Sequence, residues 1–298
     1  MVILGAEDLL FKGSHLERNA LSGAGFKKNE FFALYYGLKK VQRGDLRAGS
    51  ARALSKYYKG FGIEVGFSAY KAGFANGLAG KRPISDKKAR IFYYASRNRA
   101  LLESARRIEA DLFSGEDDHR SLTARLGVLL GYPACCIGFF IKNNSLRSPS
   151  IILNAIKNTS GQARAELNIL GAADPLISHM PCSFSCKNSL RYARKLAGIV
   201  RRDCRDGAGT YIYFNNGCFL KLRPLRCPAA LKKYALDEVS SGSFGGSFND
   251  TAAMRSLLNA FKSADTLKMG KEVTLYRSGK AFFSFPAHSC DWECIKFE

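Results

Sequence analysis

Hydrophobic positions recur at the three- and four-residue spacing of amphipathic helices through much of the first two thirds of the chain. Within 14–60 this spacing includes Phe31 and Leu34, and it predicts helices there. A short strand-like piece at 90–95 follows a polar segment, and the helical spacing then resumes over 98–113. The N-terminal part is therefore predicted to be mainly helical.

The next predicted helix places two adjacent cysteines at the start of its successor. Asp117 and Asp118 offer N-caps for a helix that runs to about residue 130, and Gly131 can end it. Pro133 suits the first position of the following helix, because its missing N–H would have no partner there. Cys135 and Cys136 are then predicted in the first turn of that helix.

A further helix is predicted over 183–202. Its apolar stripe consists of Leu190, Ala193, Ala197 and Val200. Cys182 and Cys186 lie at its start and are four residues apart, so they are predicted to project from one face of the helix.

The pattern changes after Gly207 from helical to alternating. Segments 210–214 and 218–222 flank Asn-Asn-Gly and predict one β-hairpin, and 272–276 with 281–285 around Ser-Gly predict another. Between the two hairpins, 251–262 is predicted to be a helix.

These elements predict an α+β fold with two domains. A mainly helical domain, 1–206, contains the cysteine motifs, and a smaller α+β domain, 207–298, consists of β-hairpins and one helix.

Composition and charge narrow the class of protein. The 298 residues are 46% hydrophobic and include only 8 Pro, which excludes a disordered or collagen-like chain. Lys and Arg number 46 against 25 Asp and Glu, a net charge of +21. Because such a surplus repels itself unless a polyanion neutralises it, nucleic acid is the predicted partner class.

The chain shows no pattern of export or membrane insertion. Glu7 and Asp8 stand where a secretory signal needs basic residues. The longest uncharged apolar run, 126–141, contains Gly131 and Pro133 and is shorter than the roughly 20 residues of a spanning helix. A cytosolic protein without a membrane span is predicted.

Nine cysteines in a reducing compartment point to metal ligation, catalysis or burial rather than to disulfides. Cys182 and Cys186 with Cys135 and Cys136 would supply four thiolates, and His179 can replace one of them. The competing interpretation is burial, since the segment around the adjacent pair is apolar.

The spacing favours an iron–sulfur cluster, with zinc as the alternative. Side chains of neighbouring helical residues diverge by about 100°, so Cys135 and Cys136 make a poor zinc knuckle, whereas a larger cluster tolerates the divergence. Cys182 and Cys186 also begin the CxxxCxxC signature of radical SAM enzymes, but Ser189 occupies its third position and that chemistry is rejected.

The other cysteines have weaker signals. Cys204, Cys218 and Cys227 are predicted to be small buried hydrophobes. The C-terminal residues His288, Cys290 and Cys294 have spacings that permit a second metal site or ligands to the first site, and the alternative is a frayed tail.

The pattern GYPxCC, followed by HxPCSxxC and Ser189 three residues later, resembles a largely archaeal, uncharacterised family, domain of unknown function 483. The resemblance covers about residues 125–200. It implies that the motif residues act as one unit, and it implies no particular activity.

A strongly basic region follows the second cysteine pair. Residues 187–233 contain 12 Lys and Arg against two Asp, and on the predicted helix the cations turn away from the apolar stripe. A solvated charged face is the alternative interpretation. The residues predicted to contact phosphate are Lys187, Arg191, Arg194, Lys195, Arg201, Arg202, Lys221, Arg223 and Arg226.

Tyrosines add a weaker indication of nucleic acid. Those at 35, 36, 57, 58, 93 and 94 are interleaved with basic residues, as platforms for unpaired bases would be, although helical spacing favours core positions for most of them. No helix-turn-helix, zinc-finger, RRM or KH signature is present, so a surface that recognises the shape of structured RNA such as tRNA is predicted.

Together these observations predict a cytosolic metal-binding protein, with an iron–sulfur centre, that binds or acts on structured RNA. No phosphate-binding glycine loop or hydrolase motif is present, and whether the protein is an enzyme stays open. The alternatives are a non-catalytic nucleic-acid-binding module with structural zinc, and a metal-free enzyme with Cys135 or Cys182 as its nucleophile.

Overall fold

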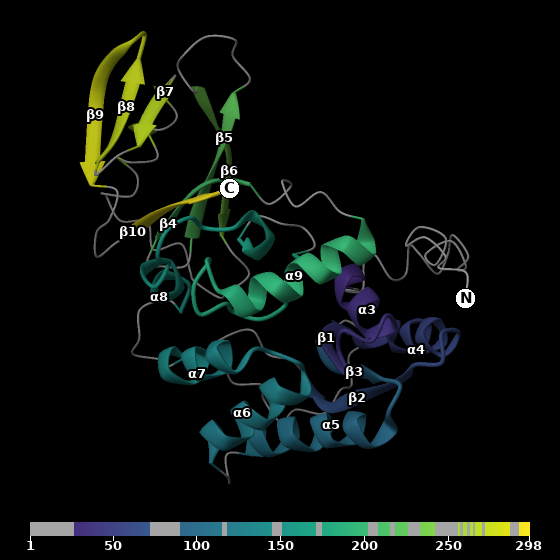
Figure 1. The fold of residues 1–298 in the computed structure, drawn as a ribbon. Helices are drawn as coiled ribbons and strands as arrows, with labels where there is room; N and C mark the ends of the chain where they lie inside the picture. Colours follow the sequence, from purple (N-terminus) through teal and green to yellow (C-terminus); the bar gives the residue numbers. More distant parts are fainter. Residues whose placement is uncertain are drawn as a thin grey trace. The chain divides into compact units, whose positions relative to one another are not determined.

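The structure is a computed structural model, shown in Figure 1. It describes residues 27–71, 90–114, 118–144, 151–170, 175–201, 208–214, 218–225, 233–241, 256, 259–260, 263–264, 266–269, 272–286 and 292–298.

Two compact units make up the chain, and neither is continuous in sequence. The first contains Met1–Lys142, Asp174–His179 and Lys187–Asp203. The second contains Asn143–Ala173, Met180–Cys186 and Cys204–Glu298. The division of the chain into domains 1–206 and 207–298 stays a prediction.

The first unit contains a three-stranded antiparallel sheet with the order β1-β3-β2 (Figure 1). The strands are β1 (Val41–Arg47), β2 (Glu64–Lys71) and β3 (Arg90–Ser96). The central strand β3 is buried on both faces, and Gly44 of β1 makes room for one of its rings, because a Cβ there would lie 2.4 Å from Tyr93 Cε1.

Helices precede, interrupt and cover this sheet. They are α3 (Lys28–Tyr35), the 3₁₀ turn η1 (Ala48–Ser50), α4 (Ala51–Lys59), α5 (Arg99–Ser114) and α6 (His119–Leu129). The helix predicted over 98–113 and the Asp118 cap are confirmed, since the Asp118 carboxylate accepts the Arg120 N–H. Helix α5 packs on β2, β3 and α6 around a core that includes Phe92, Leu102 and Leu126.

The prediction that 14–60 is helical is wrong for residues 41–47, and residues 14–26 lie outside the described part of the chain. Residues 41–47 form β1, with Val41 and Leu46 buried. Its backbone pairs with β3 at every position from Val41 to Arg47, and that distant pairing outweighs the local helical pattern.

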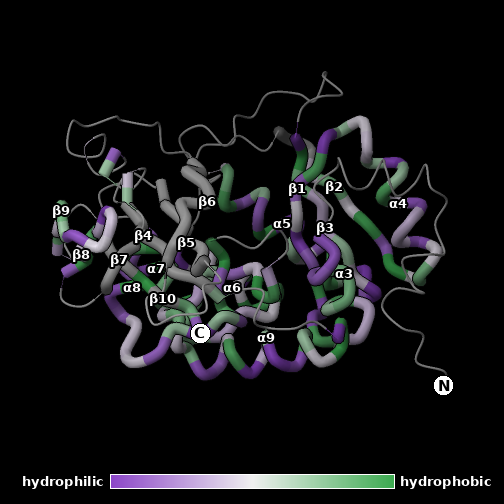
Figure 2. Tube along the Cα trace, turned by 90° about the horizontal axis from the view of Figure 1, so that it is seen from above, coloured by the Kyte–Doolittle hydropathy of each residue, from purple (hydrophilic) through white to green (hydrophobic). Residues whose placement is uncertain are grey.

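The first unit also includes most of α7 (Ala134–Asn143) and all of α9 (Lys187–Val200), the two helices that begin at the cysteine motifs. Figure 2 shows hydrophilic and hydrophobic residues alternating along α9, as expected of an amphipathic helix.

The second unit contains two antiparallel sheets. One has the order β10-β4-β5-β6 and the other β7-β8-β9. Their strands are β4 (Gly209–Phe214), β5 (Cys218–Leu225), β6 (Lys233–Ser241), β7 (Thr266–Met269), β8 (Glu272–Arg277), β9 (Lys280–Pro286) and β10 (Trp292–Phe297). The same unit contains α8 (Ile151–Lys157) and the 3₁₀ turn η2 (Ala165–Leu167).

Both predicted hairpins are confirmed, and with them the α+β class. Strands β4 and β5 pair directly, as do β8 and β9. The second hairpin turns at Ser278 and Gly279, whose φ angles of 48° and 76° suit a primed turn. The helix predicted over 251–262 falls mostly outside the described residues, of which 256, 259 and 260 are helical.

The C-terminal residues form a strand, so the frayed-tail alternative is wrong. Strand β10 pairs with β4, and Ile295 and Phe297 are buried. Within the described part of the chain, no helix has the length and apolarity needed to span a membrane.

Candidate metal centre

The first cysteine pair lies where the sequence predicts it, at the N-terminus of a helix. Helix α6 ends in a Schellman motif: Gly131, with φ +74°, donates its N–H to Val128 O, and Tyr132 donates to Gly127 O. The Pro133 carbonyl then accepts the N–H groups of Cys136 and Ile137, and α7 begins at Ala134. Cys135 and Cys136 are therefore both in its first turn.

The second pair lies on a loop, so the prediction of a helix that starts at residue 183 is wrong. Helix α9 begins at Lys187, directly after Cys186. The buried Phe184 explains the difference, because its N–H donates to Thr159 Oγ1 at 2.9 Å and its carbonyl accepts the Arg164 N–H at 2.8 Å. The Phe184 carbonyl is thereby bound to a distant residue, whereas in a helix from residue 183 it would accept the N–H four residues later.

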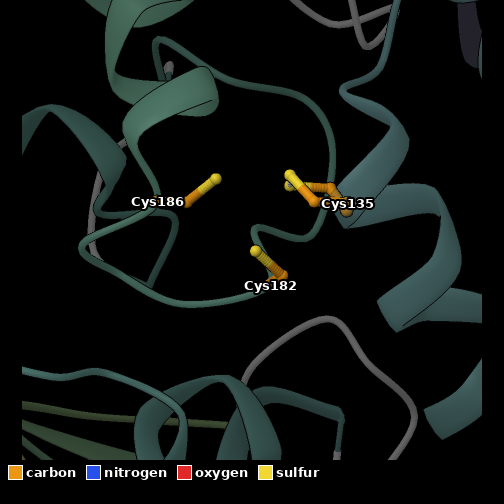
Figure 3. A group of neighbouring side chains, drawn as sticks. Cys135, Cys182 and Cys186 are labelled. Atoms are coloured by element: carbon orange, nitrogen blue, oxygen red, sulfur yellow. Dashed lines mark hydrogen bonds between the residues drawn. The ribbon is translucent and has the colours of Figure 1, made fainter.

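The structure nevertheless brings the four predicted sulfur ligands together. The Sγ atoms of Cys135, Cys136, Cys182 and Cys186 all lie within 4.8 Å of one another. Figure 3 shows the labelled side chains of Cys135, Cys182 and Cys186 pointing toward a common centre. Cys136 and Cys186 are buried, Cys182 is half-buried and Cys135 is exposed. This group can hold a metal ion.

The distance between the adjacent sulfurs matches that expected around one tetrahedral ion. With metal–sulfur bonds of about 2.3 Å, tetrahedral thiolates lie about 3.8 Å apart. The Sγ atoms of Cys135 and Cys136 are 3.9 Å apart. The two sulfurs therefore lie close together at the helix start, and the choice between an iron–sulfur cluster and zinc stays a prediction.

Two helix termini add favourable electrostatics. The adjacent pair lies in the first turn of α7, and Cys186 immediately precedes α9. Unpaired N–H groups and the helix dipole stabilise negative charge at these positions, and four thiolates on a divalent ion leave a net negative charge. The Asn188 amide also donates to Cys135 Sγ, at 3.6 Å.

His179 is not part of the sulfur group. Its Nε2 lies 2.8 Å from Ser189 Oγ, and its ring packs against Tyr132 with centroids 5.1 Å apart. Ser189 Oγ in turn lies 3.3 Å from Cys136 Sγ. The role of His179 as a metal ligand stays a prediction.

The structure describes some of the residues that were predicted to bind phosphate. On α9, Lys187, Arg191, Arg194 and Lys195 are exposed, and the exposed Arg201 follows the helix. Lys221 and Arg223 lie on β5, whose side chains are not described. Outside the described residues are Arg202, Arg226, Cys204, Cys227, His288 and Cys290. Cys218 lies on β5 and Cys294 on β10.

The structure also sorts the six tyrosines and reveals a second basic helix face. Those at 57, 58, 93 and 94 are buried, whereas Tyr35 and Tyr36 are half-buried.

The second basic helix face lies on α4, where Arg52, Lys56 and Lys59 are exposed. This face was not predicted from the sequence, where its signal is three cations at helical spacing in a segment without an acidic residue.

A buried ion pair between Lys39 and Glu30 was not predicted from the sequence. Lys39 Nζ donates to Ser178 Oγ as well and lies 5.2 Å from the centroid of the Tyr132 ring. The only sequence signal is the position of Lys39 directly after an apolar helical segment.

Comparison with protein families identifies the segment that contains this site. Residues 108–207 match a family described as a protein of unknown function, DUF483. The match confirms the resemblance shown by the two cysteine motifs, and it includes all four cysteines and α9. Neither the curated proteins nor the solved structures yielded a match.

Proposed function

We propose that this DUF483-containing chain is a cytosolic metalloprotein that binds structured RNA, such as tRNA, through the exposed face of α9. The observation that carries the proposal is the position of this helix: it begins directly after the ligand Cys186, and its solvent side is basic. A metal held by the four cysteines would fix the start of α9 and so orient its cations.

The exposed face of α9 supports binding of a polyanion. Lys187, Arg191, Arg194 and Lys195 are exposed, and the helix contains no acidic residue. Ordinary charged helix faces mix both signs, which gains stabilising pairs between neighbouring turns. A cation in the first turn, Lys187, also opposes the helix dipole at a typical cost of about 0.3–1 kcal/mol. Bound phosphate groups would compensate for the missing acidic partners and for the unfavourable position of Lys187.

Other features of the first unit are consistent with RNA. The basic face of α4 adds three cations, and the net charge of the chain is +21. Tyr35 and Tyr36 are half-buried, and the Arg97 guanidinium lies 5.1 Å from the Tyr35 ring centroid. Aromatic and guanidinium groups of this kind stack on unpaired bases.

For the metal, the 3.9 Å separation of the Cys135 and Cys136 sulfurs favours a single tetrahedral ion such as zinc. An iron–sulfur cluster is the second candidate, because such clusters also take four cysteines, and with the exposed Cys135 displaced from its iron the cluster would have a position open to a substrate. That arrangement would suit modification of a tRNA base.

Metal analysis of anaerobically purified protein separates these candidates. We expect about one zinc per chain without a visible band, whereas iron with absorbance near 400 nm would establish the cluster. Cys182→Ala and Cys186→Ala should each lose the metal, and Cys204→Ala and Cys227→Ala should retain it. A metal-free protein, or equal behaviour of all four variants, would overturn the metal centre and favour the cysteine-enzyme alternative.

The RNA part is tested on the same sample by binding of a tRNA mixture at rising salt. Affinity should fall linearly on a double-logarithmic plot, because each neutralised phosphate releases condensed counterions. Absent binding, or binding that does not change with salt, would contradict the proposal.

A further inference from the structure

Two buried residues of the first unit, His179 and Ser189, form hydrogen bonds that lead to Cys136. Ser189 is fully buried on α9, and His179 and Cys136 are 7% and 2% exposed. Ser189 Oγ lies 2.8 Å from His179 Nε2 and 3.3 Å from Cys136 Sγ. The three side chains therefore form a continuous hydrogen-bonded chain that ends on one of the four sulfurs.

When Cys136 ligates a metal, the hydrogen bonds between His179, Ser189 and Cys136 can run in only one direction. A ligating thiolate has no proton, so it can only accept a hydrogen bond. Ser189 has a single O–H, and it must donate this to Cys136 Sγ. His179 must then donate its Nε2–H to Ser189 Oγ, which fixes the tautomer of the neutral ring.

Two tyrosine rings lie near the His179 imidazole, in addition to its hydrogen bond with Ser189. The Tyr132 ring lies 5.1 Å away at an interplanar angle of 38°, and the Tyr192 ring lies 6.4 Å away at 69°. On Tyr132 the Lys39 ammonium lies 5.2 Å from the ring centroid, and Lys39 is itself paired with the buried Glu30. The histidine is thus part of a packed, polar interior.

We infer that His179 and Ser189 are positioning residues of the metal centre, which hold Cys136 as an oriented thiolate and are not ligands themselves. This inference rests on the proposed metal centre. Hydrogen bonds from residues behind the ligands fix ligand orientation, and their loss typically weakens metal binding about 10–100-fold. Here they support Cys136, the most deeply buried of the four cysteines.

The test is titration of the metal-free full chain with Co²⁺, whose absorbance reports both affinity and the number of thiolate ligands. Ser189→Ala and His179→Leu should bind Co²⁺ about 10–100-fold more weakly than the wild type, with an unchanged four-thiolate spectrum. His179→Gln should recover most of the affinity, because its side-chain amide can still donate to Ser189 Oγ.

Ser185→Ala is the matched control. Ser185 lies on the same ligand loop, but its hydroxyl contacts Ser183 Oγ, at 3.4 Å, instead of a sulfur. Its Co²⁺ affinity should equal that of the wild type. Thermal unfolding of each metal-free variant detects loss of the fold, and if Ser189→Ala unfolds, the comparison of His179→Gln with His179→Leu decides.

The outcomes distinguish the inference from the function beneath it. Wild-type protein that binds no Co²⁺ overturns the metal centre and the inference together. Tight wild-type binding with no loss in Ser189→Ala and His179→Leu leaves the metal centre intact and overturns the positioning role. A wild-type spectrum with a nitrogen ligand that disappears in His179→Leu would make His179 a ligand and also overturn it.

Discussion

At the scale of single residues, the pair of Lys39 and Glu30 shows how two buried charges compensate each other. The two side chains are only 2% and 4% exposed. Burial by itself would lower the pKa of Lys39, but the Glu30 carboxylate beside it holds that pKa above its usual value. Because each charge compensates the other, removal of either one leaves its partner buried and unpaired.

We therefore expect Lys39→Met and Glu30→Gln each to lower the free energy of unfolding by about 3–5 kcal/mol, and the double variant to lose less than the sum. Denaturant unfolding of the metal-free chain measures this. Glu103→Gln is the control, since its ion pair with Arg106 is exposed and should contribute less than about 1 kcal/mol. Additive losses in the double variant would show that the two charges do not depend on each other.

At the scale of elements, α9 joins the metal centre and the proposed RNA surface. Its N-terminus follows a ligand, its buried side includes Ser189, and its exposed side is basic. These features belong to different faces of one helix, so they can be altered separately. Arg191 and Lys195 are exposed and lie one turn apart, and neither is adjacent to a cysteine in the sequence.

Arg191→Gln with Lys195→Gln should weaken RNA binding and reduce the slope of log affinity against log salt by about 0.7–0.9 for each phosphate that is no longer neutralised. The metal content should stay unchanged, because the exposed face of α9 does not take part in metal binding. Lys280→Gln, an exposed charge on β9, serves as the control. An unaltered slope in the double variant would move the RNA surface away from α9.

At the scale of the whole chain, the C-terminus supports the ligand loop within the second unit. The buried Phe297 ring packs edge-on against Phe184, with centroids 5.0 Å apart, and Phe184 lies between Cys182 and Cys186. Glu298 adds two hydrogen bonds, because its N–H donates to Ala163 O and its carbonyl accepts the Ala165 N–H. The last residues therefore help to hold the loop of the second cysteine pair.

Phe297→Ala should lower the free energy of unfolding by about 3–5 kcal/mol, since the cavity would lie beneath Phe184. It should also weaken metal binding, because the ligand loop loses its packing partner. Thermal unfolding and Co²⁺ titration measure the two effects. Phe282→Ala, at a position that is 41% exposed, should change stability by no more than about 0.5 kcal/mol. Metal affinity unaffected by Phe297→Ala would contradict the supporting role.

The sequence by itself determined the elements whose signals are local. Gly131 and Pro133 mark the end of one helix and the start of the next, so the placement of Cys135 and Cys136 was predictable. The hairpin turn at Ser278 and Gly279 was predictable for the same reason, because a few residues fix the backbone there. The grouping of the four cysteines was predicted as well, although the second pair lies on a loop and not on a helix.

Only the tertiary structure decided the features that depend on distant partners. Residues 41–47 became a strand through pairing with β3, and Phe184 kept the second cysteine pair off a helix through Thr159 and Arg164. The final strand β10 was fixed by β4. Local propensity differs by less per residue than the burial and hydrogen bonding supplied by such contacts, so the distant partner prevails wherever the two conflict.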